Sequence, residues 1–130
     1  MQKRVCAIII RDKARLLVTG HDADFFWTPG GKIDGSDTPL ETVHREIKEE
    51  LGVNVCHATL FGTENTTNSL TNKKQVVSYL FVDVEGKLNP SNEITGYCWY
   101  TRENSRVGSL KITKNMREIT YPKLVAAGLV

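Results

Sequence analysis

The chain has 130 residues, 40% of them hydrophobic, which is the size of one domain with a single sizeable core. Its formal net charge of +2 is too small to indicate a nucleic-acid-binding surface, so no nucleic-acid partner is expected. The three cysteines, Cys6, Cys56 and Cys98, are scattered and form no C-x-x-C pair, which argues against a zinc site or a disulfide framework and favours a reducing cytoplasm.

The chain begins with two predicted strands, at residues 5–10 and 16–19, which a polar turn at residues 11–14 joins. The first apolar run is too short for a signal peptide, because charged residues end it. No segment is long enough to span a membrane, so no membrane partner is expected. Residues 1–130 are predicted to form a single domain.

A helix is predicted to begin at Pro39. Thr38 and Glu41 have the spacing of a capping box, with proline at the first helical position, and Gly52 fits the left-handed residue that ends a helix. At about 100° per residue, the apolar residues of this segment fall on one narrow stripe: Leu40, Val43, Ile47 and Leu51. The helix is therefore expected to pack against a core along this stripe.

Three glutamates, Glu46, Glu49 and Glu50, lie within two turns of this helix and flank its apolar stripe. Like charges at i,i+3 and i,i+4 destabilise a helix by roughly 0.2–0.5 kcal/mol per pair. A solvated polar face is the ordinary interpretation of charges on a helix, but these carboxylates border the buried stripe instead of opposing it. Since stability alone does not select such a trio, we predict that a cation binds it.

A glycine-rich loop at residues 27–37 leads into the helix. Gly30 and Gly31 follow Pro29 directly, and two adjacent glycines allow backbone conformations that are closed to other residues. They also leave backbone carbonyls and amides open to a ligand, whereas a generic turn needs only one or two such residues. The loop and the acidic flank of the helix are therefore predicted to form one site.

The same residues resemble a known motif. Gly31, five residues, Asp37, seven residues and then residues 45–53 (REIKEELGV) resemble the Nudix box, G-x5-E-x7-R-E-U-x-E-E-x-G-U, in which U is apolar. Every fixed position matches except the first glutamate, where this chain has Asp37. The chain is accordingly identified as a member of the Nudix hydrolase family. The resemblance implies an α+β fold of the Nudix type, an α/β/α sandwich with a mixed sheet flanked by helices.

The resemblance also implies a hydrolase of phosphoric anhydrides that uses a divalent metal, Mg²⁺ with Mn²⁺ as the alternative. Mg²⁺ prefers oxygen ligands and keeps waters and substrate phosphates in its shell. By analogy, Glu49 and Glu50 are metal ligands, Glu46 is a further ligand or a base toward water, and the Gly30 carbonyl is a backbone ligand. Arg45 resembles the residue that orients these carboxylates, and it also forms an i,i+4 pair of opposite sign with Glu49.

The loop carries two further expectations. Because Asp37 is one methylene shorter than the glutamate of the family, it is expected to reach Arg45, or an outer metal ion, through water. Activity is still expected, because the carboxylates of the helix are intact. Gly31 and Lys32 are expected to contact the substrate.

The second half of the chain alternates strands and polar segments. Strands are predicted at residues 53–61, 75–84 and 96–101. Residues 62–74, rich in asparagine and threonine, are predicted to be a polar loop. A second helix is predicted at residues 114–127, with a break or a late start at Pro122. This layout agrees with the Nudix type of fold.

Several positions outside the motif have two interpretations each. Glu93 precedes Trp99 in a loop, where Nudix members that hydrolyse triphosphates can have a further metal ligand or base; a solvated glutamate is the alternative. Asn115 resembles the asparagine with which members that clean oxidised guanine nucleotides read the purine edge, or it caps the helix. Trp27 could stack on a base, although packing against the sheet is favoured. His21 is expected to be exposed rather than bound to phosphate.

The favoured function is hydrolysis of a nucleoside triphosphate, damaged ones included, to the monophosphate and pyrophosphate, because the short chain suits a compact nucleotide. The first alternative is a nucleoside diphosphate sugar such as ADP-ribose, although Asn68 occupies the place where such members often carry proline. The second alternative is a nucleotide-binding module without turnover, for which Asp37 is the one motif defect. Members of the family are often dimers, so a homodimer is left open.

Overall fold

The computed structural model describes residues 1–12, 15–20, 25–68, 71–91, 94–108 and 110–130. The strands are β1 (Gln2–Ile8), β2 (Ile10–Arg11), β3 (Arg15–Gly20), β4 (Phe26–Trp27), β5 (Gly30–Lys32), β6 (Asn54–Thr67), β7 (Lys74–Glu85) and β8 (Gly96–Tyr100). The helices are α1 (Pro39–Leu51), α2 (Arg102–Val107) and α3 (Tyr121–Ala126), and a π-helical segment, Met116–Thr120, precedes α3. No helix among these residues is long and apolar enough to cross a membrane.

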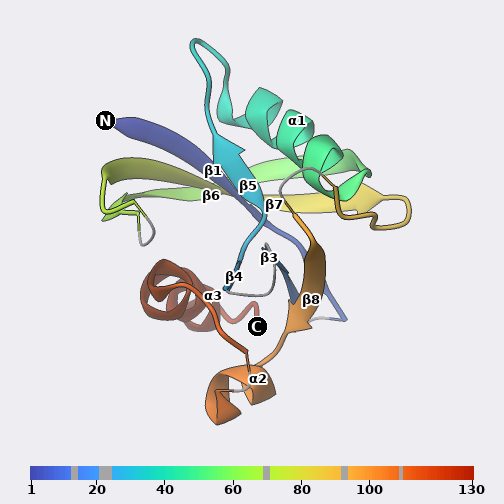
Figure 1. The fold of residues 1–130 in the computed structure, drawn as a ribbon, viewed down its shortest axis with the longest axis vertical. Helices are drawn as coiled ribbons and strands as arrows, with labels where there is room; N and C mark the ends of the chain where they lie inside the picture. Colours follow the sequence, from blue (N-terminus) through green and yellow to red (C-terminus); the bar gives the residue numbers. More distant parts are fainter. Residues whose placement is uncertain (13–14, 21–24, 69–70, 92–93, 109) are drawn as a thin grey trace.

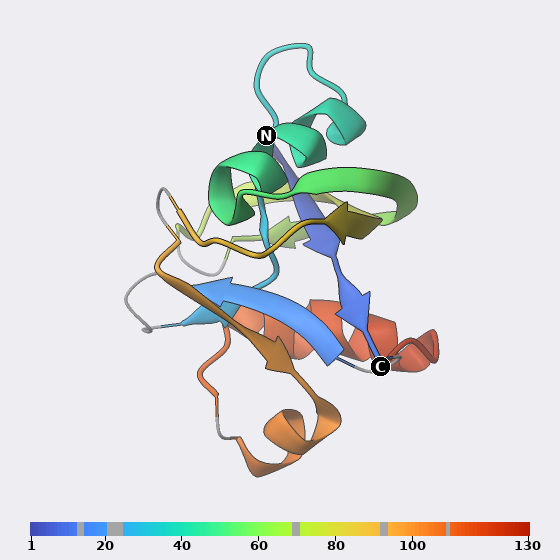
Figure 2. The ribbon, with the colours of Figure 1, turned by 90° about the vertical axis from the view of Figure 1, so that its right-hand side faces the viewer.

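The described strands form two sheets. In the first sheet the order is β5-β1-β7-β6, with β1 parallel to β7 and antiparallel to β5. In the second sheet the order is β2-β3-β4, and β8 also pairs with β3. Helix α1 lies on one side of the first sheet, while the second sheet and α3 lie on the other (Figures 1 and 2). The predicted α+β class, with mixed strands between helices, is confirmed.

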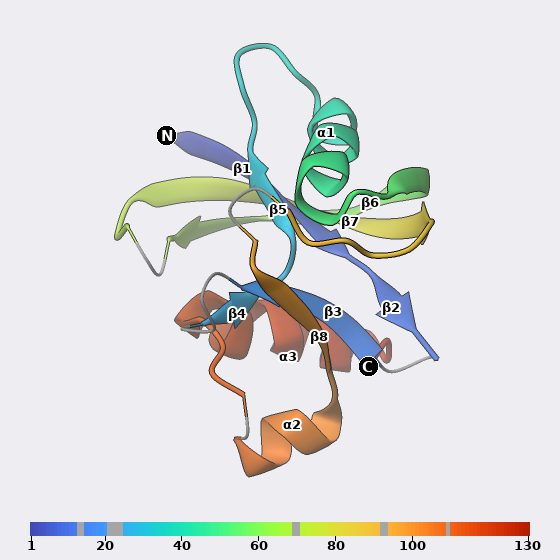
Figure 3. The same cartoon turned by 45° about the vertical axis from the view of Figure 1, so that its right-hand side comes forward.

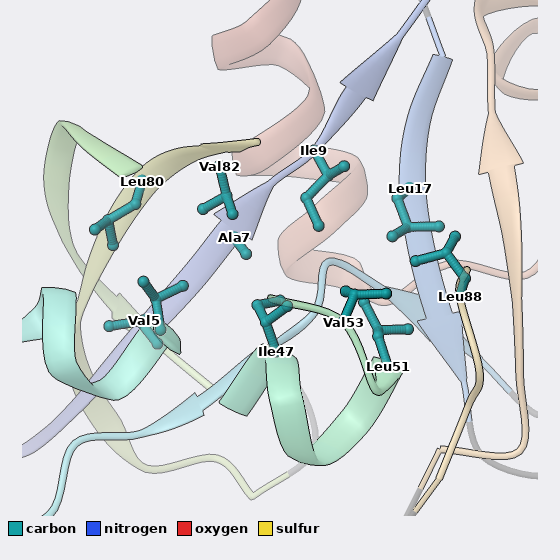
Figure 4. Packing of buried hydrophobic residues seen from close by; sticks show 11 residues of the cluster. Val5, Ala7, Ile9, Leu17, Ile47, Leu51, Val53, Leu80, Val82 and Leu88 are labelled. Atoms are coloured by element: carbon teal, nitrogen blue, oxygen red, sulfur yellow. The ribbon is translucent and has the colours of Figure 1, made fainter. Parts of the chain in front are cut away.

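The apolar stripe of α1 packs onto the first sheet. Val43, Ile47 and Leu51 are fully buried, and Figure 4 shows Ile47 and Leu51 beside side chains of β1, β3 and β7. Burying a side chain of this kind stabilises the fold by about 1.5–3 kcal/mol. Leu40, in the first turn, is 47% exposed, so the stripe is buried only from Val43 onward. This packing fixes the rotation of α1 and therefore the direction of its glutamates.

The ends of α1 are those that the sequence predicts. Thr38 Oγ1 accepts a hydrogen bond from the Glu41 amide at 3.1 Å, and the Thr38 amide donates to Glu41 Oε1 at 3.0 Å. Gly52 is left-handed, with a φ of 66°, and its amide donates to the Lys48 carbonyl at 3.0 Å. The capping box and the glycine cap are therefore both confirmed.

The predicted polar loop at residues 62–74 is wrong at residues 62–67 and at Lys74, which lie in strands. Strand β6 continues to Thr67 and pairs with β7 as far as Thr67↔Lys74, after a register shift between Leu60 and Gly62. Because β6 is an edge strand, its polar side chains can face solvent while its backbone bonds to β7. A run of threonine and asparagine therefore resembled a loop, although it forms a paired strand.

The C-terminal helix is confirmed with a local change. The chain is helical from Lys114, widens into the π-helical segment and continues as α3 with Pro122 in its first turn. Pro122 has no N–H to donate to the preceding turn, which agrees with an irregular helix just before it. The sequence did not predict α2, nor did it predict that Gly30–Lys32 forms a strand on β1.

Candidate active site

The backbone of Gly30 lies at the open edge of the first sheet. On either side of it, the Ala7 amide donates to the Pro29 carbonyl at 2.7 Å and the Ile33 amide donates to the Lys3 carbonyl at 2.8 Å. In an antiparallel ladder these pairs alternate with pairs that exchange no hydrogen bond, so the polar groups of Gly30 point away from β1. Its amide donates instead to Glu50 Oε1 at 3.0 Å. The edge of β5 is thereby joined to α1.

Both glycines are required by close contacts. At Gly30 the φ is 151°, and an added Cβ would lie 2.1 Å from the Val5 carbonyl oxygen. An added Cβ at Gly31 would lie 2.5 Å from the carboxylate carbon of Glu46. The absence of a side chain at Gly31 lets the Glu46 carboxylate of α1 rest on the backbone of β5, whereas at Gly30 it lets β5 lie against β1.

The three glutamates differ in their surroundings. Glu50 is 9% exposed, the side chain of Glu46 is 18% exposed, and Glu49 lies open to solvent. Burial raises the pKa of Glu46 above its ordinary value; the nearby Glu49 charge adds to this, and Arg45 opposes it. One exposed carboxylate therefore lies near two that are mostly buried, and the resulting negative site opens to solvent at Glu49.

Arg45 is held by acidic groups of the loop. Its Nη1 donates to Asp37 Oδ2 at 2.7 Å, and its Nη2 lies 3.4 Å from Asp34 Oδ2 and 3.6 Å from Glu46 Oε1. The expectation that Asp37 needs a water to reach Arg45 is wrong, because the loop brings the shorter carboxylate into direct contact. The predicted pair of Arg45 with Glu49 is not among the ion pairs of the described residues, since the guanidinium turns toward the loop instead.

The residues of this site fit a hard divalent cation in their donor chemistry. Glu46, Glu49 and Glu50 offer carboxylate oxygens from neighbouring positions of α1, and the backbone of Gly30, which faces away from β1, adjoins them. Among the described residues, no three histidine, cysteine, aspartate or glutamate side chains are already gathered closely enough to hold an ion. Like charges repel, which agrees with carboxylates that are not gathered around one point. Glu50 accepts a hydrogen bond from the Gly30 amide instead.

A pocket of about 130 Å³ opens on the other face of the first sheet and reaches Gly30. Trp27 and Asn115, both expected at the substrate, lie in its wall. The amide nitrogen of Asn115 donates to the Thr67 carbonyl at 2.8 Å, and its side chain makes no cap bond at the π-helical segment that follows it. Asn115 therefore ties the C-terminal helix to the end of β6, and the alternative of a helix cap is not supported there.

The remaining predicted residues are distributed as follows. Lys32 is exposed on β5, opposite Arg4 of β1, and Arg4 also lines the pocket. Glu93 and His21 lie outside the described residues. Sequence reasoning missed Arg4 and Gln75 in the pocket wall. For Gln75 a signal did exist, because it is a polar residue on the same side of its strand as two apolar positions, Val77 and Tyr79.

The fold and this site define a family. The family model of the NUDIX domain matches residues 1–121, so the chain belongs to the Nudix family. Among solved structures it is similar to the MutT protein from Methanosarcina mazei Go1, with a TM-score of 0.79 and 22% identity, over 97% of this chain and 94% of that one. It is also similar to a NUDIX hydrolase from Nitrosomonas europaea, with a TM-score of 0.77 and 17% identity, over 98% and 90% of the two chains. The TM-scores show a common fold, and at identities this low they show the fold alone.

One sequence relative covers part of the chain. The 8-oxo-dGTP diphosphatase of Proteus vulgaris is 34% identical over an alignment of 65 residues, and the match covers 45% of this chain and 58% of that protein. The chain thus spans less than two thirds of this relative.

Proposed function

We propose that this chain is a metal-dependent pyrophosphohydrolase that cleaves a nucleoside triphosphate, damaged ones included, to the monophosphate and pyrophosphate. The observation that carries the proposal is the position of Gly30. Its amide is bonded to Glu50 of the acidic helix, and the same residue lines the pocket on the other side of the sheet. A nucleotide with its base in the pocket would therefore present its phosphates to the carboxylates. The relative named 8-oxo-dGTP diphosphatase supports the substrate class.

The metal proposed for this site is Mg²⁺, with Mn²⁺ as the alternative. Glu46, Glu49, Glu50 and the Gly30 carbonyl would hold it. When bound, it would neutralise charge on the phosphate oxygens and help to place the attacking water. Carboxylate and carbonyl oxygens, with room left for water and phosphate, are the ligands that such an ion prefers.

The side chains of the chain have separate roles in this proposal. Arg45, which is bonded to Asp37, holds the Glu46 carboxylate in place. Glu46 itself would act either as a metal ligand or as the group that accepts a proton from the attacking water. Lys32 and Arg4 occupy paired positions on β5 and β1 and supply positive charge beside the pocket. The water oxygen would bond to phosphorus, the bridging P–O bond would break, and the leaving pyrophosphate would take the bonding electrons.

The proposal is tested by incubating the protein with a panel of nucleoside triphosphates and nucleoside diphosphate sugars and Mg²⁺, measuring pyrophosphate, orthophosphate and monophosphate separately. We expect pyrophosphate from at least one triphosphate, and a loss of roughly 10²-fold or more in Glu49→Gln, as is usual when a metal-site group is removed. Glu103→Gln is the matched control, because Glu103 is an exposed glutamate on α2, at the far end of the molecule from α1 (Figure 3).

The outcomes separate the alternatives. No turnover of any compound with Mg²⁺ or Mn²⁺ would reject the proposed hydrolase and favour the alternative of a nucleotide-binding module without turnover. Release of a monophosphate from ADP-ribose, with no pyrophosphate from triphosphates, would assign it to the diphosphate sugars. Equal activity of Glu49→Gln and the unmodified chain would reject the role of Glu49.

A further inference from the structure

Gln75 is a buried polar residue in the wall of the pocket. It is 5% exposed and shares its face of β7 with Val77 and Tyr79, which also line the pocket. The pocket volume of about 130 Å³ is close to that of a cavity of ~150 Å³ that holds a benzene molecule. The pocket therefore has room for a planar ring, and Gln75 is one of the polar groups that such a ring would meet.

The orientation of the Gln75 amide is set by the turn between β6 and β7. The Thr71 amide donates to Asn68 Oδ1 at 3.1 Å. A backbone N–H can only donate, so the oxygen of the Asn68 side chain faces Thr71 and its nitrogen faces the other way. That nitrogen donates to Gln75 Oε1 at 3.2 Å. The Thr71 amide thus fixes the orientation of the Asn68 side chain. Asn68 in turn fixes the orientation of Gln75, whose oxygen accepts from Asn68 and whose nitrogen is directed elsewhere.

This chain of contacts leaves the Gln75 nitrogen as the group available to a ligand. Its oxygen is engaged by Asn68, and within the described part of the chain its Nε2 has no hydrogen-bond partner. Among the described residues, Tyr121 Oη is the buried side-chain polar atom without a partner, so Gln75 Nε2 is accessible from the pocket. A ligand that displaced solvent from Nε2 without offering an acceptor would leave this donor unpaired, whereas an acceptor on the ligand would stabilise the complex. Arg4, the neighbouring charged residue of the wall, can also only donate. This part of the wall therefore offers donors.

We infer that Gln75 selects the nucleobase by donating from Nε2 to an acceptor on the base edge, which favours a base with a carbonyl oxygen there over one with an amino group. The inference rests on the proposed function and refines its substrate class. An amino group at this place would bring two donors together and leave the Gln75 donor unpaired. Asn68 acts as a positioning residue, because it reaches the base only through the orientation of Gln75.

The test compares nucleotides that differ in one group, carbonyl or amino: ITP with ATP, and UTP with CTP. We expect kcat/KM to favour the carbonyl member of the accepted pair by roughly 3- to 10-fold or more, the value of one hydrogen bond. Gln75→Leu, of similar size and without polar atoms, should abolish the preference. Gln75→Glu, which presents acceptors in place of a donor, should move the preference toward the amino member.

Asn68→Asp tests the relay without changing Gln75. An aspartate can still accept from the Thr71 amide, but it cannot donate to Gln75, so the Gln75 amide should rotate and present its oxygen to the pocket. The base preference should then reverse as in Gln75→Glu. Asn72→Asp is the control, because it adds the same charge to the same turn without contacting Gln75, and its preference should be that of the unmodified chain.

Binding separates this inference from the proposed function. Titration calorimetry of IMP and AMP without metal measures base selection in the absence of turnover. Tighter binding of IMP, lost in Gln75→Leu, would support the inference even if no triphosphate were hydrolysed, in which case only the proposed activity would fall. Hydrolysis with equal kcat/KM for ITP and ATP, equal binding of IMP and AMP, and an unchanged profile in Asn68→Asp would overturn the inference and leave the activity standing.

Discussion

The two glycines of β5 make room for different groups. Gly30 clears the carbonyl of Val5 on the neighbouring strand, whereas Gly31 clears the carboxylate of Glu46 on α1. Only the second contact involves a proposed catalytic side chain. Arg45 Nη2 lies 3.6 Å from Glu46 Oε1, so a carboxylate displaced by an added side chain would also change its contact with Arg45. The glycine at position 31 therefore sets where the Glu46 carboxylate lies.

Replacing Gly31 with alanine should lower activity more than stability. The added Cβ would lie 2.5 Å from the Glu46 carboxylate carbon. Because this carboxylate is the end of a flexible side chain that can shift, the unfolding free energy should fall by less than the ~1–3 kcal/mol that overpacking a tight core costs. Displacement of the carboxylate should lower kcat/KM by up to about 10²-fold. Urea denaturation and pyrophosphate release measure the two effects. Gly96→Ala is the control, because an added Cβ there meets nothing within 4 Å; equal behaviour of both variants would contradict the close contact.

Asp37→Asn should separate activity from stability. The Arg45–Asp37 pair is partly open to solvent, with side chains 32% and 36% exposed, so its loss should change the unfolding free energy by less than about 1 kcal/mol. Loss of the anchor should free Arg45 and lower activity by about 10–100-fold. Asp34→Asn, at a longer distance and with a side chain 70% exposed, should have a smaller effect. Indistinguishable kinetics of the two variants would show that Asp37 does not position Arg45.

At the scale of elements, local sequence patterns with a specific hydrogen-bond geometry were sufficient to predict where a helix begins and ends. The capping box, the proline at the first position and Gly52 predicted both ends of α1, because each makes its hydrogen bond within a few residues. The end of β6 could not be predicted in this way. Its pairing to Lys74 depends on β7, and the alternation of threonine and asparagine is compatible with either a loop or an edge strand.

Hydrogen exchange distinguishes the strand from the predicted loop. The Asn68 amide donates to the Lys73 carbonyl at 2.8 Å, which by antiparallel alternation places the Thr66 and Glu64 amides in the ladder with β7. The Asn65 and Thr67 amides face outward, as the bond from Asn115 to the Thr67 carbonyl also indicates. We expect slow exchange at positions 64 and 66 and faster exchange at 65 and 67, measured by NMR. Uniformly fast exchange at positions 64–67 would contradict the paired strand and support the loop.

At the scale of the molecule, the first sheet separates two halves of the site. The carboxylates of α1 lie on one face, the pocket opens on the other, and β5 at the edge of the sheet contacts both. The sequence predicted the first half, because one motif contains all of it. The pocket draws on β1, β5, β7, the turn after β6 and the C-terminal helix, so only the folded chain brings Gln75, Asn68 and Arg4 together.

The central claim is that the acidic face of α1 and the backbone of Gly30 together bind a divalent cation. Crystals grown with Mn²⁺ and a triphosphate analogue that resists hydrolysis test this most directly, because anomalous scattering locates the ion without reference to the protein. We predict one or more ions between the Glu46, Glu49 and Glu50 carboxylates and the Gly30 carbonyl, in contact with the phosphates. A bound analogue with these carboxylates turned apart, and with the ion elsewhere or absent, would contradict the claim.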